Sequence, residues 1–264
     1  MLDPQTAVHV HDQLRSRGPL VQVITNYVSM DIAANLLNAA GASPAMVHDA
    51  REAGEFAGLA QAVVANIGTL SPPWVDGMLA AVEVASAAGK PWVLDPVAVG
   101  ATTYRRETAA LLVEHRPTVI RGNASEILAI ATSTGAGRGV DADADTADVR
   151  ADAEALASKL DTVVAMTGVV DVVTDGTRTA HVIGGDDRAP MITALGCSAS
   201  ALVAACCAVH DDSFEASASA LAILTAAIEQ AALLAEGPGS LRWRLLDALS
   251  TLPSAAVAGV VARR

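Results

Sequence analysis

Short apolar runs alternate with stretches of helical periodicity along most of the chain. The runs that predict strands are Leu20–Thr25, Ser43–Val47, Ala62–Ile67, Pro91–Leu94, Thr118–Arg121, Thr162–Met166, Val169–Thr174 and Thr179–Ile183. Between them, apolar residues recur at the spacing that predicts helices. Helices are expected over 5–17, 29–41, 71–89, 105–115, 151–160, 197–209, 214–235 and 240–249, with others around Glu52 to Phe56 and after Gly122. The alternation predicts an α/β fold with a central, mostly parallel sheet and helices on both faces.

Two segments depart from this alternation. Asp175-Gly176 separates the last two strand-like runs and predicts a tight hairpin, so these runs should form a small antiparallel addition to the sheet. Residues 131–150 are polar and rich in glycine, which predicts a loop. The chain contains no low-complexity linker, sequence repeat or abrupt change of composition. We therefore expect one domain over residues 1–264.

One of the predicted helices is apolar on every side. From Cys197 to Val209 there is no charged residue, proline or glycine, which predicts a helix buried inside the protein. Gly196, just before it, lets the backbone approach a ligand closely, and the unpaired N–H groups and dipole of a first helical turn attract anions. The same residues are compatible with an ordinary left-handed turn into a core helix with a buried cysteine.

Composition narrows the functional classes. Hydrophobic residues make up 52% of the chain and aromatic residues 3%, which suits small side chains packed closely between helices and sheet. The net charge of −12 disfavours nucleic acid and anionic membranes as partners, although a local positive pocket could still bind ATP. Three cysteines, two of them the adjacent Cys206 and Cys207, form neither a disulfide framework nor a zinc pattern, which favours a reducing cytoplasm.

No apolar segment predicts a membrane span or a signal peptide. The start of the chain, Met1 to Pro4, lacks the basic and apolar regions of a secretion signal. The longest apolar stretches, 197–209 and 219–235, are too short or carry Glu229 and Gln230. We expect a cytoplasmic protein.

Polar and small residues follow the predicted strands, where open parallel sheets bind their ligands. These residues are Asn26, Met46, Asn66-Ile67-Gly68-Thr69, Asp95, Arg121-Gly122-Asn123 with Glu126, Thr167-Gly168 and Gly196-Cys197. Each also has a structural explanation: an asparagine can cap a turn, Asp95 before a proline can form an Asx turn, and Glu126 can complement a helix dipole. Their joint occurrence at strand ends is harder to explain structurally.

The residue types point to phosphate chemistry. Asp95 and Glu126 could hold Mg²⁺ through water, and Arg121, the Thr167-Gly168 turn and a helix N-terminus are groups that bind phosphate. The sequence has no P-loop pattern, and Gly135-Ala-Gly-Arg-Gly139 is no dinucleotide fingerprint because no strand precedes it.

At these positions the chain resembles the hydroxyethylthiazole kinase family, thiamin-salvage enzymes of the ribokinase-like superfamily. The matching segments occur in the family's order from about residue 20 to the C-terminus. They are Ile24–Asn35, Gly41–Met46, Asn66–Trp74, Lys90–Thr102, Arg116–Glu126, Thr167-Gly168 and Thr193–Cys197.

The resemblance implies ATP- and Mg²⁺-dependent phosphorylation of the hydroxyl of 4-methyl-5-(2-hydroxyethyl)thiazole. It also implies a homotrimer with the thiazole pocket between neighbouring subunits. The implied roles are as follows: ATP contacts at Arg121, Thr167, Asn123 and Gly168; magnesium at Asp95 and Glu126; thiazole contacts at Asn26, Met46, Gly68 and Ala194; and an anion hole for the transferred phosphoryl group at Gly196 and Cys197.

Two features differ from related sequences. Most ribokinase-like enzymes have an aspartate base where this chain has Cys197, and the commoner form of the motif has Gly-Thr in place of Ala194-Leu195. Because phosphoryl transfer asks little of a base, a cysteine can serve here, and a helix N-terminus favours a lowered thiol pKa. A non-catalytic binder on the same fold and a kinase for another small alcohol, such as a pyrimidine or pyridoxal-type substrate, are the alternatives. A binder would not need the magnesium set, so the presence of Asp95, Arg121, Asn123 and Glu126 favours a kinase. The set Asn26, Met46 and Gly68 favours the thiazole as its substrate.

Overall fold

The computed structural model describes residues 2–137 and 146–263 of the chain. Residues 138–145, in the middle of the loop predicted over 131–150, therefore lie outside the described residues. Both ends of the predicted loop are helical in the structure. Helix α6 continues to Ser133, and α7 already begins at Thr146.

The described residues form eight strands, eleven α-helices and one short 3₁₀ helix. The strands are β1 (Leu20–Ile24), β2 (Ser43–Ala45), β3 (Ala62–Asn66), β4 (Trp92–Asp95), β5 (Val119–Asn123), β6 (Val163–Thr167), β7 (Val170–Thr174) and β8 (Thr179–Ile183). The helices are α1 (Pro4–Arg17), α2 (Met30–Ala40), α3 (Ala53–Leu59), α4 (Pro72–Ala87), α5 (Thr103–Glu114), α6 (Ala124–Ser133), α7 (Thr146–Leu160), α8 (Leu195–Cys207), α9 (Ser213–Ala232), α10 (Pro238–Thr251) and α11 (Ser254–Val261), with η1 at Ala189–Met191.

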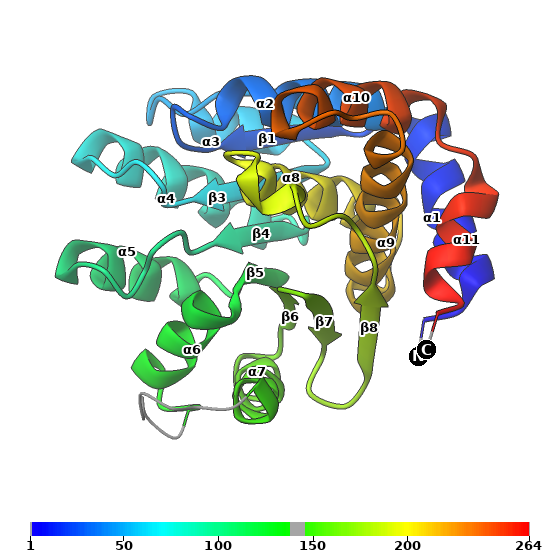
Figure 1. Ribbon diagram of the computed structural model, residues 1–264. Helices are drawn as coiled ribbons and strands as arrows, with labels where there is room; N and C mark the ends of the chain where they lie inside the picture. The colour runs from blue at the N-terminus through cyan, green and yellow to red at the C-terminus, as the bar shows by residue number, and fades with distance from the viewer. Residues whose placement is uncertain (1, 138–145, 264) are drawn as a thin grey trace.

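The strands form one sheet in the order β2-β1-β3-β4-β5-β6-β7-β8 (Figure 1). All pairs from β2 to β6 are parallel, and β7 pairs antiparallel with both β6 and β8. The predicted mostly parallel sheet and the hairpin at Asp175-Gly176 are thus confirmed. Gly176 has a φ of +85°, a left-handed conformation that glycine adopts without strain.

Helices cover both faces of this sheet, as the sequence predicts. On one face α8 packs across β1, β3 and β4 and α9 across β6 to β8, with α1, α2, α10 and α11 outside them. On the other face α3, α4, α6 and α7 pack against the strands, with α5 between α4 and α6. Helix α8 is therefore a core helix: residues 198–207 are all buried.

On the α8 side and at the C-terminus, two further helices differ from the sequence prediction. Helix α8 begins at Leu195, two residues before the expected Cys197, so Gly196 belongs to its first turn and Ala194 takes the left-handed conformation with a φ of +65°. The short helix α11 was not expected. It buries Val257 and Val260 against the core, in an Ala-rich segment with too few residues to show a clear period.

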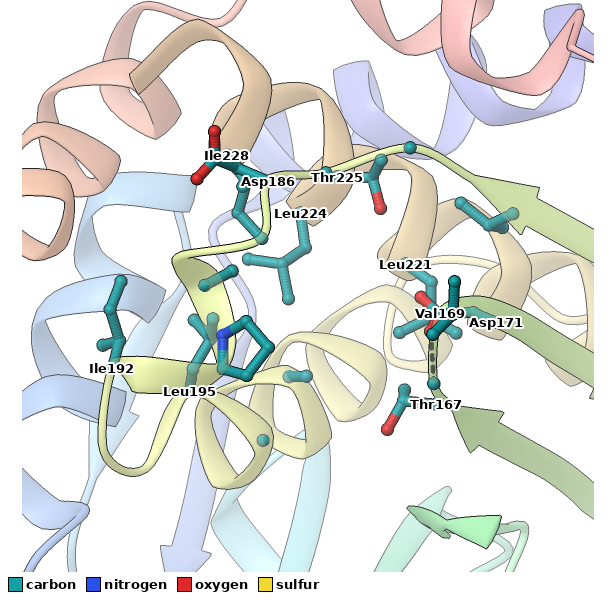
Figure 2. Close-up of a pocket in the computed structure, with 18 of the residues that line it drawn as sticks. Thr167, Val169, Asp171, Asp186, Ile192, Leu195, Leu221, Leu224, Thr225 and Ile228 are labelled. Atoms are coloured by element: carbon teal, nitrogen blue, oxygen red, sulfur yellow. Dashed lines mark hydrogen bonds between the residues drawn. The ribbon is translucent and has the colours of Figure 1, made fainter. Parts of the chain in front are cut away.

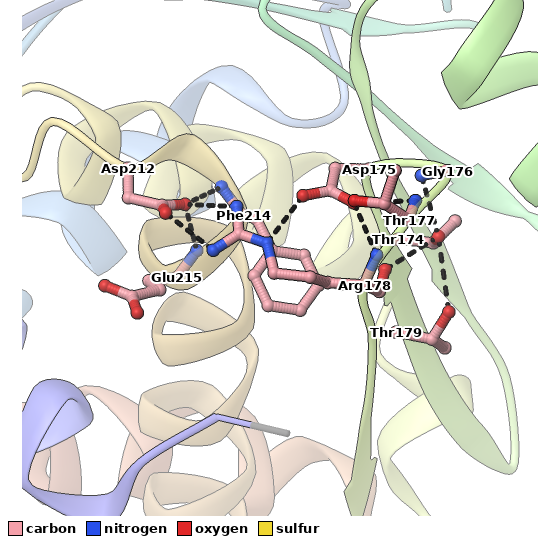
Figure 3. A network of polar contacts seen from close by, with 9 residues as sticks. All are labelled: Thr174, Asp175, Gly176, Thr177, Arg178, Thr179, Asp212, Phe214 and Glu215. Atoms are coloured by element: carbon pink, nitrogen blue, oxygen red, sulfur yellow. Dashed lines mark hydrogen bonds and ion pairs between the residues drawn. The ribbon is translucent and has the colours of Figure 1, made fainter.

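The β7–β8 hairpin is fastened to the start of α9 by Arg178 (Figure 3). Its guanidinium donates to Asp175 at 2.7 Å and, through two nitrogens, to both carboxylate oxygens of Asp212, the N-cap of α9, at 2.7 and 3.1 Å. The same guanidinium lies 4.4 Å from the centre of the Phe214 ring. These contacts fix the turn of the hairpin. The turn lies at the opposite end of the strands from Thr167 and Ile183, where β6 and β8 end.

In the described part of the chain, no single helix is long and apolar enough to cross a bilayer. Only α10 and α11 together reach that length and composition, and they are bent by 108°.

Candidate active site

The parallel strands bring the predicted site residues to one edge of the sheet. Because β2, β1 and β3 are neighbours, Met46 and Gly68 follow the strands on either side of the strand that leads to Asn26. Asp95 ends β4, Arg121 and Asn123 lie in β5, and Thr167 ends β6. The first turn of α8 lies on the same edge, since Ser200 of that helix reaches Asp95 and Cys197 reaches Asn26.

A chain of buried hydrogen bonds connects the ends of β1, β3 and β4 with α8. The Nδ2 of Asn26 donates to Oδ1 of Asn66 at 3.0 Å and to Sγ of Cys197 at 3.3 Å. The Nδ2 of Asn66 donates to Oδ2 of Asp95 at 2.6 Å, and Ser200 donates to the same oxygen at 2.9 Å. The amide of Gly68 donates to Oδ1 of Asn66 at 2.9 Å.

Asp95 is the acid at the centre of this network and is only 1% exposed. Burial raises the pKa of Asp95 to about 6, although the nearby Arg121 and the donated hydrogen bonds favour its ionised form, and Glu126 disfavours it. A carboxyl group whose pKa is this close to neutral pH can take up or release a proton in the physiological pH range.

The thiol of Cys197 does not have the lowered pKa that its place in a first helical turn suggested. Burial raises the pKa of Cys197, and the negative charge of Asp95 raises it further, against the hydrogen bond from Asn26. Desolvation outweighs the hydrogen bond that Asn26 donates to the sulfur at 3.3 Å. The thiol is therefore protonated at neutral pH.

A cavity of about 720 Å³ opens on the other side of the first turn of α8 (Figure 2). One part has the groups expected for phosphate: Arg121, Thr167, Gly168, Ala194 and Gly196. The other part is mostly apolar and lies against α9 and the segment after β8. It is lined by Val182, Ile192, Leu221, Leu224, Thr225 and Ile228, with Asp186 and Asp187 near the rim. A polar part joined to an apolar part of this size suits a nucleotide.

Arg121 is the basic group in the polar part of the cavity. It is only 8% exposed, and its Nη2 donates to Oγ1 of Thr167 at 2.5 Å. Its buried Nε has no hydrogen-bond partner among the described residues. A Cβ on Gly196 would lie 2.7 Å from Nη1, so the absence of a side chain at Gly196 leaves the space that the guanidinium occupies.

Asp171 is an acid in the same cavity that the sequence analysis did not single out. Its carboxylate accepts the Gly168 amide at 3.0 Å and so fixes the turn between β6 and β7. Burial raises the pKa of Asp171 to about 6, against the effects of the Gly168 amide and of Arg121.

Asn123 and Glu126 form a capping box at the start of α6. The side chain of Asn123 accepts the Glu126 amide at 3.0 Å, and Oε2 of Glu126 accepts the Asn123 amide at 2.9 Å. The other oxygen of Glu126 accepts the amide of Ala98, in the turn after Asp95, at 2.9 Å. Glu126 therefore has the structural role at a helix start that the sequence allowed. Its contact with Ala98 also places the carboxylate beside the end of β4, which carries Asp95.

These residues fit a magnesium ion held partly by water. Each oxygen of Glu126 accepts one hydrogen bond and keeps a lone pair, and Oδ1 of Asp95 accepts none from any residue described. Mg²⁺ commonly uses one or two carboxylates together with water and substrate phosphates. In residues 2–137 and 146–263 there is no cluster of three or more His, Cys, Asp or Glu that would hold a metal by protein ligands alone.

Gly68 lies directly against Asn26. A Cβ on Gly68 would come within 2.5 Å of Asn26 Nδ2, so only glycine allows this contact. Arg105, which no sequence pattern indicated, donates to the carbonyls of Ile67, Val97 and Gly68 at 2.5, 2.8 and 2.9 Å. It thereby ties the turn after β3 to the turn after β4.

Met46 follows β2 and is partly buried against the core. Its carbonyl lies 3.3 Å from Nδ1 of His48, whose ring stacks on Trp74 with 4.0 Å between centroids. The structure thus gives His48 a packing role beside Met46.

Comparison with known proteins decides the family. The profile described as "Hydroxyethylthiazole kinase family" matches residues 11–255. The chain belongs to the hydroxyethylthiazole kinase family. A hydroxyethylthiazole kinase of Rhizobium etli is 53% identical over 247 residues, which cover 93% of this chain and 96% of that protein.

Solved structures agree with this family and with the fold. A hydroxyethylthiazole kinase structure from Pyrococcus horikoshii superposes with a TM-score of 0.89 at 37% identity, covering 96% of both chains. A ribokinase-like superfamily protein of Enterococcus faecalis superposes with a TM-score of 0.65 at 9% identity, covering 94% of both, which shows the fold alone. The expected family, the ribokinase-like fold and the kinase class of activity are confirmed. The roles of individual residues rest on the geometry above.

Proposed function

We propose that the chain transfers the γ-phosphoryl group of ATP to the hydroxyl of 4-methyl-5-(2-hydroxyethyl)thiazole, a step of thiamin salvage. The observation that carries this proposal is the position of the first turn of α8. On one side of it lies the cavity of about 720 Å³ with Arg121 and Gly196, and on the other lies the Asn26–Asp95 network. A donor and an acceptor bound on these two sides would meet at the amides of that turn.

In this scheme the nucleotide occupies the cavity. Arg121, Thr167 and Gly168 bind the phosphates at its polar part, together with Asn123 at the start of α6. The base lies between the apolar residues of α9 and the segment after β8. The amides of Gly196 and Cys197 and the dipole of α8 stabilise charge on the transferred group.

The alcohol binds on the side of Asn26, Met46 and Gly68. Ala194, at the N-cap of α8, lines the nucleotide cavity, so we assign it to the boundary between the two substrates. Asp95 lies behind the turn, and its Oδ1, which accepts no hydrogen bond from the described residues, is the oxygen placed to accept the proton that leaves the hydroxyl. Cys197, protonated and close to Asn26, orients the alcohol.

Magnesium is the implied cofactor, and Asp95 and Glu126 would hold it. When bound, it neutralises phosphate charge during transfer. The protein's own contribution is to bring the hydroxyl, Asp95 and the phosphate-binding amides together and to exclude water from the cavity.

The decisive experiment is a coupled assay of ADP release with Mg²⁺-ATP. We expect release with the thiazole alcohol, and none after chelation of Mg²⁺. The assay includes pyridoxal and a hydroxymethylpyrimidine as competing alcohols. Activity with one of these and none with the thiazole would show that the substrate assignment is wrong.

We further propose a homotrimer with active sites between subunits, acting in the cytoplasm, each chain being one domain over residues 1–264. Tyr27 and Val28 follow Asn26 directly and are 67% and 62% exposed, which suits contact with a neighbouring copy beside the alcohol site. The three cysteines are all free thiols, as a reducing compartment would keep them. Neither nucleic acid nor membrane is among the proposed partners.

A further inference from the structure

The side chain of Asn66 connects Asn26 to Asp95 within the hydrogen-bond network. Asn66 ends β3, is fully buried and makes three hydrogen bonds with its side chain. Its Oδ1 accepts from the Gly68 amide and from Asn26, both on the alcohol side. Its Nδ2 donates to Asp95 on the opposite side.

Only one orientation of the Asn66 amide satisfies these partners. The groups facing its oxygen are two donors, the Gly68 N–H and the Asn26 NH₂, and the group facing its nitrogen is a carboxylate oxygen. The reversed amide would set donor against donor and acceptor against acceptor in a buried site, where unmade hydrogen bonds are costly. The side chain is thus fixed at both ends.

The contact with Asp95 has a consequence for that acid. Asn66 and Ser200 both donate to Oδ2, so this oxygen is held within the protein. Oδ1 accepts no hydrogen bond from the described residues and is the oxygen left for a ligand. Asn66 differs from Ser200 because it also holds Asn26, whose second N–H donates to Cys197 at 3.3 Å.

We propose that Asn66 is a positioning residue that sets the orientation of Asp95 and the position of Asn26 together. It couples the geometry of the acid to that of the alcohol-binding side chains, without itself touching the reacting atoms. This inference rests on the function proposed above.

The test compares Asn66→Ala, Asn26→Ala, the double variant and Ser200→Ala by steady-state kinetics in the same assay. We expect Asn66→Ala to raise KM for the thiazole alcohol and to lower kcat, reducing kcat/KM by about 10- to 100-fold, with KM for ATP nearly unchanged. Ser200→Ala should lower kcat alone, because Ser200 touches Asp95 but not Asn26. Asn35→Ala, on the exposed surface of α2, is the matched control and should change neither constant.

The double variant separates positioning from simple packing. If Asn66 acts through Asn26, the double variant should have a thiazole KM no higher than the worse single variant. Additive effects on KM would show that Asn66 does not act through Asn26, and native kinetic constants beside a lowered melting temperature would show that Asn66 only stabilises the fold. Either result would overturn the inference.

If Asn66→Ala does not fold, the isosteric Asn66→Asp replaces it. That change sets two carboxylate oxygens against each other across the present 2.6 Å contact and should lower kcat by at least 10-fold. Native kinetics in Asn66→Asp would overturn the inference. A wild-type protein that turns over no alcohol would instead overturn the proposed function.

Discussion

Cys197 lies in the first turn of a buried helix, yet its chemistry is set by its neighbours rather than by the helix. Its thiol contacts Asn26, and burial together with the charge of Asp95 raises its pKa. A protonated thiol can orient an alcohol but is a poor nucleophile at neutral pH. A covalent phosphocysteine is therefore not expected.

Replacing Cys197 by alanine should slow the reaction without abolishing it. The amides of the first turn of α8 remain, so binding of the phosphates is preserved, while orientation of the alcohol is lost. We expect kcat to fall by about 10²–10⁴ with KM for ATP nearly unchanged. Cys206→Ala, deeper in the same helix, is the control and should keep kcat. Complete loss of turnover in a folded Cys197→Ala protein would point to a covalent role.

Gly196→Ala tests the contact with Arg121. The sequence suggested that a side chain at Gly196 would enter phosphate space, but the first group that it meets is the guanidinium, at 2.7 Å. Arg121 would have to move, so we expect KM for ATP to rise by about tenfold or more, from loss of charge-assisted hydrogen bonds to phosphate. Gly239→Ala on α10, where a Cβ meets nothing within 4 Å, is the control. An unchanged KM would mean that Arg121 does not bind the nucleotide.

Asp171→Asn should make stability less dependent on pH. The pKa of Asp171 is about 6 in the folded protein, above the value of about 3.9 in an unfolded chain, so the folded state holds this proton more tightly. Its ionisation therefore costs stability progressively as the pH rises from about 4 through 6. Asparagine keeps an acceptor for the Gly168 amide and has no charge to bury.

Melting temperatures of wild type and Asp171→Asn at several pH values check this. The variant should match wild type near pH 4 and be more stable at pH 7.5 by up to about 2 kcal/mol. Asp187→Asn, an exposed acid at the rim of the same cavity, should change the melting temperature little at either pH. A gain of the same size at both pH values would contradict the assignment.

At the scale of elements, the β7–β8 hairpin is held at its turn by Arg178 and lines the proposed nucleotide cavity at its other end. Arg178 holds the fixed end against Asp175 and Asp212, while Val182 and Gly184 at the other end belong to the cavity lining. Because the guanidinium is partly exposed, its contacts should contribute modestly to stability.

Arg178→Met should lower stability and leave catalysis intact. Methionine keeps the apolar stem near Phe214 but loses the paired bonds to both carboxylates, and we expect a loss of about 1 kcal/mol in denaturant unfolding with kcat/KM unchanged. Arg51→Met, which breaks a more exposed pair with Asp49, should have a smaller effect. A large fall in kcat/KM would show instead that the hairpin transmits strain to the cavity.

Element patterns predicted most strands well because these strands contain buried apolar residues, Val or Ile among them, bounded by turns. They failed for α11, which is short and Ala-rich, and for the start of α8, where Ala194 and not a glycine adopts the left-handed conformation.

The site residues at the strand ends could be predicted from the sequence because the carboxyl ends of parallel strands lie at one edge of the sheet. Their pairing could not, because bonds such as Asn66 to Asp95 and Ser200 to Asp95 join residues 29 and 105 positions apart. Arg105, among the polar residues of the first turn of α5, could not be distinguished in the sequence from an exposed helix residue.

For the whole molecule, the proposed trimer makes a prediction in solution. Light scattering should give three times the chain mass of 26.7 kDa. The exposed Tyr27 and Val28 should lie in the contact, so Tyr27→Asp should weaken assembly and activity together, whereas Leu59→Asp, an exposed apolar residue of α3, should affect neither. A monomer with full activity would contradict the shared site.

Both edge strands of the eight-stranded sheet have features that hinder pairing with a further strand. At one border β2 has only three residues, and the middle one, Pro44, has no N–H to offer. At the other, α9 and α11 pack against β8, and Arg263 donates to the carbonyl of Ile183. These features disfavour extension of the sheet from one molecule into the next. They thereby oppose growth into cross-β fibres from the native state and favour association through side chains of loops and helices.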